Sequence, residues 1–224
     1  MTLLNWIFIG LLVIDTALIV VSIIKKIDLM QKICSALFFP IALVHIPMLL
    51  VDYLPDSFHS ILFSILALSA IAVSFCLYIF FTNKIPALII FSLGNALWCE
   101  LFRTIFYIYR MPSWAIIFIL CFYIAIIIAC HIITGHKSTS EYLIVTITLF
   151  FASMLNFIGL FNLICGPCAK SILLFTGSFL NLALTALNFI DEKKFNIKQG
   201  MLIRTITLSA SQFLISLCNL MLFL

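Results

Sequence analysis

The sequence contains very little charge. Only twelve Lys or Arg and eight Asp or Glu residues occur among 224, or 9% of the chain, while 65% of the residues are hydrophobic. The mean hydropathy is +1.32. A soluble domain cannot hide this much apolar surface from water, so the composition excludes a soluble globular protein. Nucleic acid is excluded as a partner because the few cations are dispersed instead of forming one basic stripe.

Several chemical motifs are also lacking. The sequence has no H-x-x-x-H pair, no Gly-rich phosphate loop and no G-x-S-x-G element. Zinc-dependent, phosphate-loop and serine-type hydrolase chemistry therefore has no support from motifs. The four histidines are scattered along the chain, whereas a metal site needs three or four converging ligands. We predict no metal site and no cofactor.

The chain has instead a series of long apolar runs. A bilayer core of about 30 Å requires about 20 apolar residues per helix. Backbone groups in lipid must be paired within helices or closed barrels, and unbroken apolar runs exclude the alternating barrel pattern. The sequence predicts an all-α, polytopic membrane bundle of about eight transmembrane helices, forming one domain over residues 1–224. The expected spans are Leu3–Ile24, Ile33–Leu54, Phe58–Phe81, Ile85–Tyr109, Ser113–Thr134, Tyr142–Ile164, Ser171–Ile190 and Met201–Leu224.

The basic residues between the spans predict the orientation. Most of them, including Lys25, Lys84, Lys137 and Lys193, fall at one side of the predicted bundle, which is therefore expected to be cytoplasmic. An even number of spans then places both termini on the lumenal or exterior side. The first run continues into Lys25 without a small-residue cleavage site, so we expect it to remain as a span. Span lengths fit either the endoplasmic reticulum or the plasma membrane.

Two of the eight cysteines differ from the rest. Six lie within or at the edges of apolar runs, where cysteine packs as a small apolar residue. Cys165-Gly166-Pro167-Cys168 is a C-x-x-C turn between two expected spans. Such a turn resembles a thioredoxin-type redox turn, although the βαβ pattern around that motif is lacking. The alternatives are a redox pair, a structural turn, or a static disulfide on the non-cytoplasmic side.

The ionisable residues inside the spans are candidates for function, because charge within a bilayer is costly. Asp15 falls near the middle of the first expected span, and Glu100 lies in the fourth with Arg103 three residues later. Both carboxyl groups are candidate catalytic acids. The alternative for Glu100 is an ion pair with Arg103 on the same helix face.

Polar side chains also fall at similar depths in different spans. With a rise of about 1.5 Å per residue, Asp15, His45, Asn95 and Asn181 all come out about 13 to 18 Å from the cytoplasmic edge. Ser74 and Gln212 approach the same zone. These residues predict a polar pocket in the bundle core, with His45, Ser74, Asn95, Asn181 and Gln212 binding a substrate. The alternative is that such side chains only join helix to helix.

The last two spans carry a pattern that resembles a known family. Gly177-Ser178-Phe179-Leu180-Asn181 is followed, after a charged stretch, by Ser209-Ala210-Ser211-Gln212-Phe213-Leu214-Ile215. This order is similar to the lysoplasmalogenase-like (YhhN) family, whose members have about eight spans and end with G-A-x-x-F-x-x-S-D and Y-x-x-Q-x-L-I helices. The segment from Thr148 to Asn156 also resembles the sixth span of that family, and the resemblance extends in order along the whole chain.

The resemblance implies hydrolysis of the vinyl ether bond of a lysoplasmalogen, with a lysophospholipid or another single-chain lipid as the partner. Carboxylic acids suit this reaction because a proton must be delivered to carbon. By this resemblance, the family's two Asp residues correspond to about Ser74 and to Asn181 or Leu182, and its His corresponds to about Asn95. The expectation is therefore either a divergent hydrolase that uses Asp15 or Glu100, or a non-catalytic relative that binds or transports lipid. The oligomeric state is left open by the sequence.

Overall fold

The computed structural model describes residues 3–34, 36–37, 58–80, 84–105, 113–135, 138–194 and 200–223, and throughout these residues the regular structure is helical, with no strand. The all-α fold class is therefore confirmed. Most of the expected span Ile33–Leu54, including His45, lies outside the described residues. The helices are α1 (Leu3–Ile24), α3 (Phe58–Phe80), α4 (Ile85–Ile105), α5 (Ser113–Thr134), α6 (Thr139–Cys165), α7 (Ala169–Lys194) and α8 (Gly200–Phe223).

Five of these helices are long and apolar enough to cross a membrane, judged over the described residues. In α1, the apolar segment found among the described residues is Val13–Ser22, which is shorter than these five segments. The chain thus has the helices of a multi-pass integral membrane protein. The five segments are Ile61–Phe80, Ile85–Arg103, Ile116–Ile133, Thr139–Cys165 and Ala169–Phe189.

The end of α7 differs from the sequence-based prediction. The charged stretch after Phe189 was expected to be a loop at the membrane surface, but the helix continues through residues 191–194 and ends at Lys194. Charged residues can extend a helix beyond the hydrocarbon layer, because Lys and Glu are good helix formers and need no apolar surroundings. The expectation of a loop was therefore wrong at this point.

The turn between α5 and α6 shows why those two helices end and begin where they do. Gly135 has a φ angle of +55°, in the left-handed region that favours glycine, and its N–H donates to the carbonyl of His131. Ser138 then caps α6, since its Oγ accepts the N–H of Glu141 at 3.2 Å. A helix C-terminal glycine and a serine N-cap thus set the α5–α6 boundary.

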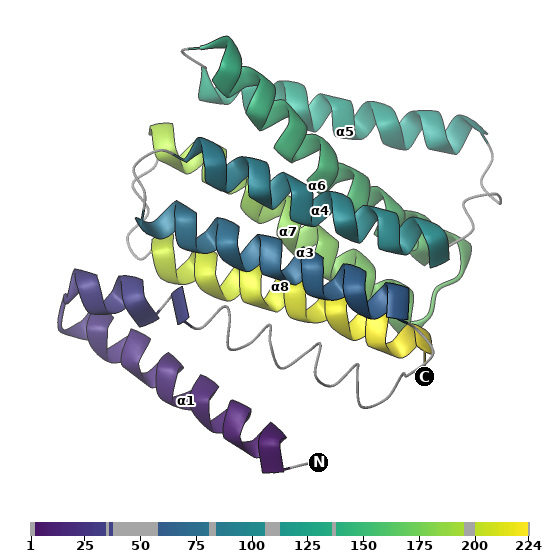
Figure 1. Ribbon diagram of the computed structural model, residues 1–224. Coiled ribbons are helices and arrows are strands. Elements are labelled where there is room, and N and C mark those ends of the chain that lie inside the picture. The colour runs from purple at the N-terminus through teal and green to yellow at the C-terminus, as the bar shows by residue number, and fades with distance from the viewer. Residues whose placement is uncertain are drawn as a thin grey trace.

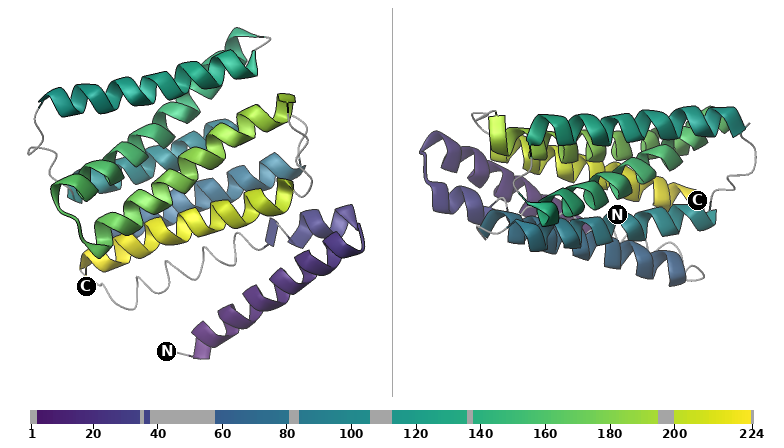
Figure 2. Two further views of the ribbon diagram at one scale, coloured as in Figure 1. Left: turned by 180° about the vertical axis from the view of Figure 1, so that it is seen from behind. Right: turned by 90° about the horizontal axis from the view of Figure 1, so that it is seen from above.

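Helices α3, α4, α6, α7 and α8 form the central bundle (Figure 1). The largest interfaces join α3 to α4, α7 to α8, α6 to α7 and α4 to α6. Helix α5 lies outside this bundle and contacts α6 and α7 (Figure 2). Among the described residues, α1 shares no extensive interface with any of α3 to α8. The central bundle is therefore where residues from different helices meet.

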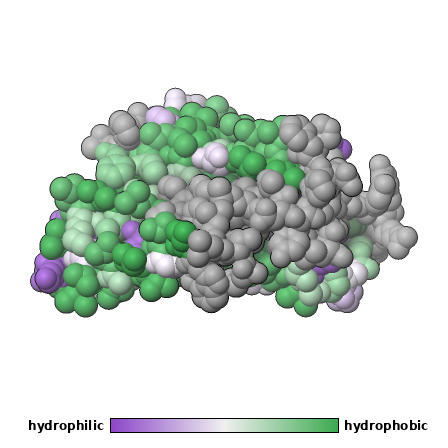
Figure 3. Space-filling model, turned by 60° about the horizontal axis from the view of Figure 1, so that its bottom comes forward, coloured by the Kyte–Doolittle hydropathy of each residue, from purple (hydrophilic) through white to green (hydrophobic). Residues whose placement is uncertain are grey.

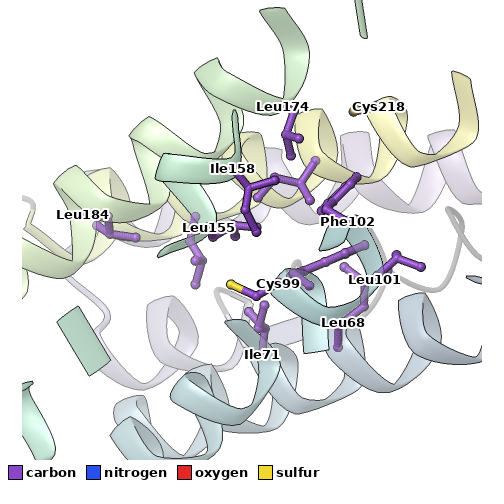
Figure 4. Close-up of a cluster of buried hydrophobic side chains, with 14 of the residues drawn as sticks. Leu68, Ile71, Cys99, Leu101, Phe102, Leu155, Ile158, Leu174, Leu184 and Cys218 are labelled. Atoms are coloured by element: carbon purple, nitrogen blue, oxygen red, sulfur yellow. The ribbon is translucent and has the colours of Figure 1, made fainter. Parts of the chain in front are cut away.

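The core of the central bundle consists of closely packed apolar side chains. Ile71 of α3, Phe102 of α4, Leu155 and Ile158 of α6, and Leu174 of α7 are all almost fully buried (Figure 4). Trp98 stacks on Phe102 with a centroid separation of 5.7 Å. This cluster of buried side chains packs the five helices of the central bundle against one another.

The outside of the molecule is apolar as well. Only 17% of the apolar segment in α5 is buried, against 50% of that in α6, and Trp114, Phe118 and Ile132 are each more than 70% exposed. The described surface in Figure 3 is largely hydrophobic, with hydrophilic residues toward its two ends. Such a surface is stable in lipid and would aggregate in water.

Two glycines allow close approach between helices. A Cβ atom at Gly159 of α6 would lie 2.9 Å from the Cα of Phe175, and one at Gly177 of α7 would lie 3.0 Å from the carbonyl oxygen of Ser211. Small residues at helix crossings permit this backbone proximity in membrane bundles. The close contact between α6 and α7 therefore depends on glycine at position 159, and that between α7 and α8 depends on glycine at position 177.

Candidate functional site

Two of the predicted binding residues, Asn95 and Asn181, form a hydrogen-bonded amide pair. The Nδ2 of Asn181 on α7 donates to the Oδ1 of Asn95 on α4 at 2.7 Å, and both residues are completely buried. The Nδ2 of Asn95 and the Oδ1 of Asn181 have no hydrogen-bond partner among the described residues. The sequence places Asn95 and Asn181 at similar depth as predicted substrate-binding residues, and that role stays a prediction. Their contact joins α4 to α7, and the pair retains an unused donor and acceptor.

Gln212 forms a separate contact. Its Oε1 accepts the Nε1–H of Trp98 at 3.0 Å, so that α8 is joined to α4 one turn away from Asn95. Its Nε2 has no partner among the described residues. Gln212 was predicted to bind substrate, and its described hydrogen bond is with the buried indole.

A third buried contact joins α5, α6 and α7. The hydroxyl of Tyr123 donates to the Oδ1 of Asn156 at 2.6 Å, and the Nδ2 of Asn156 donates to the Oγ of Ser178 at 3.1 Å. All three residues are buried. Polar groups in lipid form such contacts between helices, so this chain of hydrogen bonds positions the outer helix α5 against the bundle.

A pocket lies at one end of the central bundle, where α3 and α7 approach their C-terminal ends and α4, α6 and α8 begin. Its volume is about 50 Å³. A water molecule needs roughly 10–15 Å³ by this measure, so the pocket holds about three to five water-sized groups. Its wall is mainly apolar, and the polar members of the wall are Ser74, Tyr78, Thr148, Thr185, Asn188 and Arg204.

Two cations lie beside the tyrosine in the pocket wall. Arg204 donates from Nη1 to the hydroxyl of Tyr78 at 3.2 Å, and its guanidinium carbon lies 5.6 Å from the ring centroid. The Nζ of Lys84 lies 4.3 Å from the same centroid and donates to the carbonyl of Tyr78. Cation–π contact orients both groups. Two cationic side chains therefore lie against the ring of Tyr78, and one of them, Arg204, lines the pocket.

The hydroxyl groups of the wall donate to the protein and present their oxygens as acceptors. Ser74 donates to the carbonyl of Ala87 at 2.7 Å, and Thr185 donates to the carbonyl of Asn181 at 2.6 Å. The latter contact lies within α7 and ends at the backbone carbonyl, separate from the side-chain amide of Asn181. In addition, the Oδ1 of Asn188 has no hydrogen-bond partner among the described residues.

The predicted carboxylic acids lie elsewhere. Asp15 is on α1, which is not packed extensively on the bundle; it is 5% exposed, and its Oδ2 has no hydrogen-bond partner among the described residues. Glu100 forms the predicted ion pair with Arg103, with Oε1 2.6 Å from Nη2 and both side chains about half exposed. Neither acid lines the pocket. His45, the remaining predicted binding residue, lies outside the described residues.

The structure brings only part of the predicted set together. Ser74 lies in the pocket wall, whereas Asn95 and Asn181 pair with each other and Gln212 pairs with Trp98. Sequence reasoning gave Arg204 no chemical role and did not consider Tyr78. The sequence does carry a signal for these residues. Arg204 is a basic residue about one turn inside the last span, and Tyr78 and Lys84 lie on either side of the connection between α3 and α4. Within the described part of the chain, no three His, Cys, Asp or Glu side chains are grouped to hold a metal ion.

Comparison of the chain with protein-family models, with curated proteins and with solved structures finds no match.

Proposed function

We propose that this chain is an eight-span membrane protein that binds a single-chain lipid through an anionic head group, without catalysing a reaction. The observation that carries the proposal is the position of Arg204, whose guanidinium lies in the wall of a mainly apolar pocket beside Tyr78. In a chain with so few charges, an arginine placed in such a pocket is a candidate for ligand recognition.

The size and charge of the pocket suit a phosphate. Three to five water-sized groups is about the room that a phosphate needs, and a guanidinium can donate two parallel hydrogen bonds to phosphate oxygens. Lys84 adds a second positive charge near Tyr78. The volume is too small for an acyl chain, which would extend from the pocket into the surrounding lipid.

The apolar part of the wall favours a lipid over a free phosphate ion. Phe75, Phe91, Leu184 and Leu208 are among the apolar residues of the wall. Each methylene group that moves from water onto such a surface gains about 0.8 kcal/mol. A lysophospholipid combines the phosphate, which the cations recognise, with methylene groups that the apolar wall accepts.

The chemistry of the wall supports binding without catalysis. Cleavage of a vinyl ether requires an acid that protonates carbon. The described polar side chains of the pocket are hydroxyl, phenol, amide and guanidinium groups, none of which is a carboxylic acid.

The alternative proposal is a lysoplasmalogenase-like hydrolase. One contact favours the underlying resemblance, because Asn95 and Asn181, the positions equated with the family's His and Asp, are hydrogen-bonded to each other. A hydrolase would need Asp15 or Glu100 to act as the acid. Incubation with a lysoplasmenyl-ethanolamine and measurement of released fatty aldehyde decides between the proposals: release that depends on either carboxyl group, tested with Asp15→Asn and Glu100→Gln, would replace the binding proposal.

The binding proposal is tested with the full-length protein in lipid nanodiscs. Lysophosphatidylethanolamine and a monoacylglycerol with the same acyl chain are compared by native mass spectrometry. We expect preferential retention of the phospholipid. Arg204→Gln should weaken its binding by about 10-fold or more, because a charge-assisted hydrogen bond contributes about 1.5–3 kcal/mol.

The matched control is Arg103→Gln, which makes the same substitution at an exposed arginine outside the pocket. We expect this variant to bind the phospholipid as the wild type does. Equal retention of both lipids by the wild type, or equal effects of the two arginine substitutions, would contradict the proposed site.

A further inference from the structure

The turn between α6 and α7 contains two exposed thiols. Cys165 is the last residue of α6, and Cys168 immediately precedes α7. Both are exposed, and neither forms a disulfide. The lipid pocket lies about 20 residues further along α7, and therefore about 30 Å away at 1.5 Å per residue. The static disulfide considered from the sequence is not present, and the pair is separate from the proposed lipid site.

Ser171 holds this turn in place. Its Oγ accepts the N–H of Cys168 at 2.9 Å and lies 3.0 Å from the carbonyl oxygen of Gly166 and 2.9 Å from that of Cys168. The residue is 1% exposed. A buried hydroxyl thus fixes the backbone of the second cysteine while both thiols remain at the surface.

The surroundings of Cys168 favour its thiolate form. The neighbouring Ser171 side chain, the backbone N–H groups of Ser171 and Lys170 and the charge of Lys170 together hold the pKa of Cys168 below its ordinary value. These groups are at the start of α7, where the helix dipole also stabilises negative charge. These surroundings favour Cys168 as the attacking thiol of the pair.

We propose that Cys165 and Cys168 form a thiol–disulfide exchange site whose substrates are disulfides. The thiolate of Cys168 attacks one sulfur of the substrate R–S–S–R, which breaks the S–S bond and releases R–S⁻. Cys165, after losing its proton, attacks the sulfur of Cys168 in the mixed disulfide and releases the second R–S⁻. The two cysteines are oxidised to one disulfide, the substrate is reduced, and the two thiol protons end on the two R–SH products.

The sequence spacing allows the internal bond to form. Two residues separate the cysteines, which is the C-x-x-C spacing of proteins that form an internal disulfide during thiol–disulfide exchange. Pro167 restricts the conformations of the turn. Cys121, the other exposed cysteine, lies on the outer helix α5 and has no vicinal thiol.

The experiment uses the full-length protein in nanodiscs, equilibrated with glutathione and glutathione disulfide at a series of ratios. Thiols are trapped with N-ethylmaleimide and the peptides are identified by mass spectrometry. We expect a reversible Cys165–Cys168 disulfide whose fraction follows a two-electron dependence on the ratio. Cys121→Ser is the matched control, and it should leave that dependence unchanged.

Two variants separate the roles of the cysteines. In Cys165→Ser, a glutathione adduct should accumulate on Cys168, because the resolving thiol is lost. In Cys168→Ser, adduct formation on Cys165 should be much slower. Cysteines that stay reduced at every ratio, a bond that glutathione cannot reduce, or adducts that form equally fast on both residues would overturn the proposal.

Discussion

Replacement of Gly159 by alanine is expected to loosen the contact between α6 and α7. The added Cβ would lie 2.8 Å from the Oγ of Ser178, 2.9 Å from the Cα of Phe175 and 3.1 Å from its backbone nitrogen. Favourable contacts between carbon atoms lie at about 3.5–4.0 Å. Backbone atoms cannot rotate away as a side chain can, so the two helices must separate by several tenths of an ångström.

The expected size of the effect follows from three contributions. Forcing an extra group into a packed interior costs about 1–3 kcal/mol, and loss of the hydrogen bond from Asn156 to the displaced Ser178 adds about 0.6 kcal/mol, the average in membrane bundles. The higher helix propensity of alanine returns about 1 kcal/mol. Gly159→Ala should therefore lower the free energy of unfolding by about 0.6–2.6 kcal/mol.

The assay is reversible unfolding in mixed micelles by titration with sodium dodecyl sulfate, followed by circular dichroism. Gly10→Ala is the matched control, because a Cβ at Gly10 of α1 would have no atom within 4 Å, and only the propensity gain should appear. Unchanged stability of Gly159→Ala, or an equal loss in Gly10→Ala, would refute the close helix contact.

Three further predictions concern the polar residues. Asn181→Leu should destabilise the protein by about 1–3 kcal/mol, because it leaves the buried amide of Asn95 without its partner, and the double variant with Asn95→Leu should recover part of the loss in the same unfolding assay. Because Ser171 lowers the pKa of Cys168, Ser171→Ala should shift the rate of alkylation of Cys168 to higher pH. A pH profile measured by mass spectrometry that is the same in both proteins would contradict this role. Arg204→Gln should leave helix content unchanged by circular dichroism, since its described hydrogen bond, to Tyr78, is a side-chain contact.

The sequence predicts the helices well where apolar runs end at clear signals. The expected bounds of α1 and α5 are those of the structure, since a pair of lysines follows the first run and a glycine follows the other. The end of α7 was missed because charged residues signal the membrane surface, which need not be the end of a helix. Apolar composition thus locates a span more reliably than it locates the helix boundary.

The sequence predicted how deep a residue lies along its helix, but it did not predict which side of the helix faces the pocket. The rise per residue placed Asn95 and Asn181 in one layer, and the structure joins them. Which residues face the pocket depends on how each helix is rotated about its axis. Helices that are apolar on every side carry no periodic signal for that rotation, so Arg204 and Tyr78 could be assigned to the pocket only from the packed structure.

The central claim is that the pocket beside Arg204 holds the head group of a single-chain lipid. The most direct measurement is photocrosslinking in nanodiscs with a lysophospholipid that carries a photoreactive group next to its phosphate, followed by identification of the labelled peptides. We predict labels on the pocket residues Tyr78, Thr185 and Asn188, and their loss in Arg204→Gln. Labels spread over the exposed face of α5, or a pattern that the substitution does not change, would contradict the account.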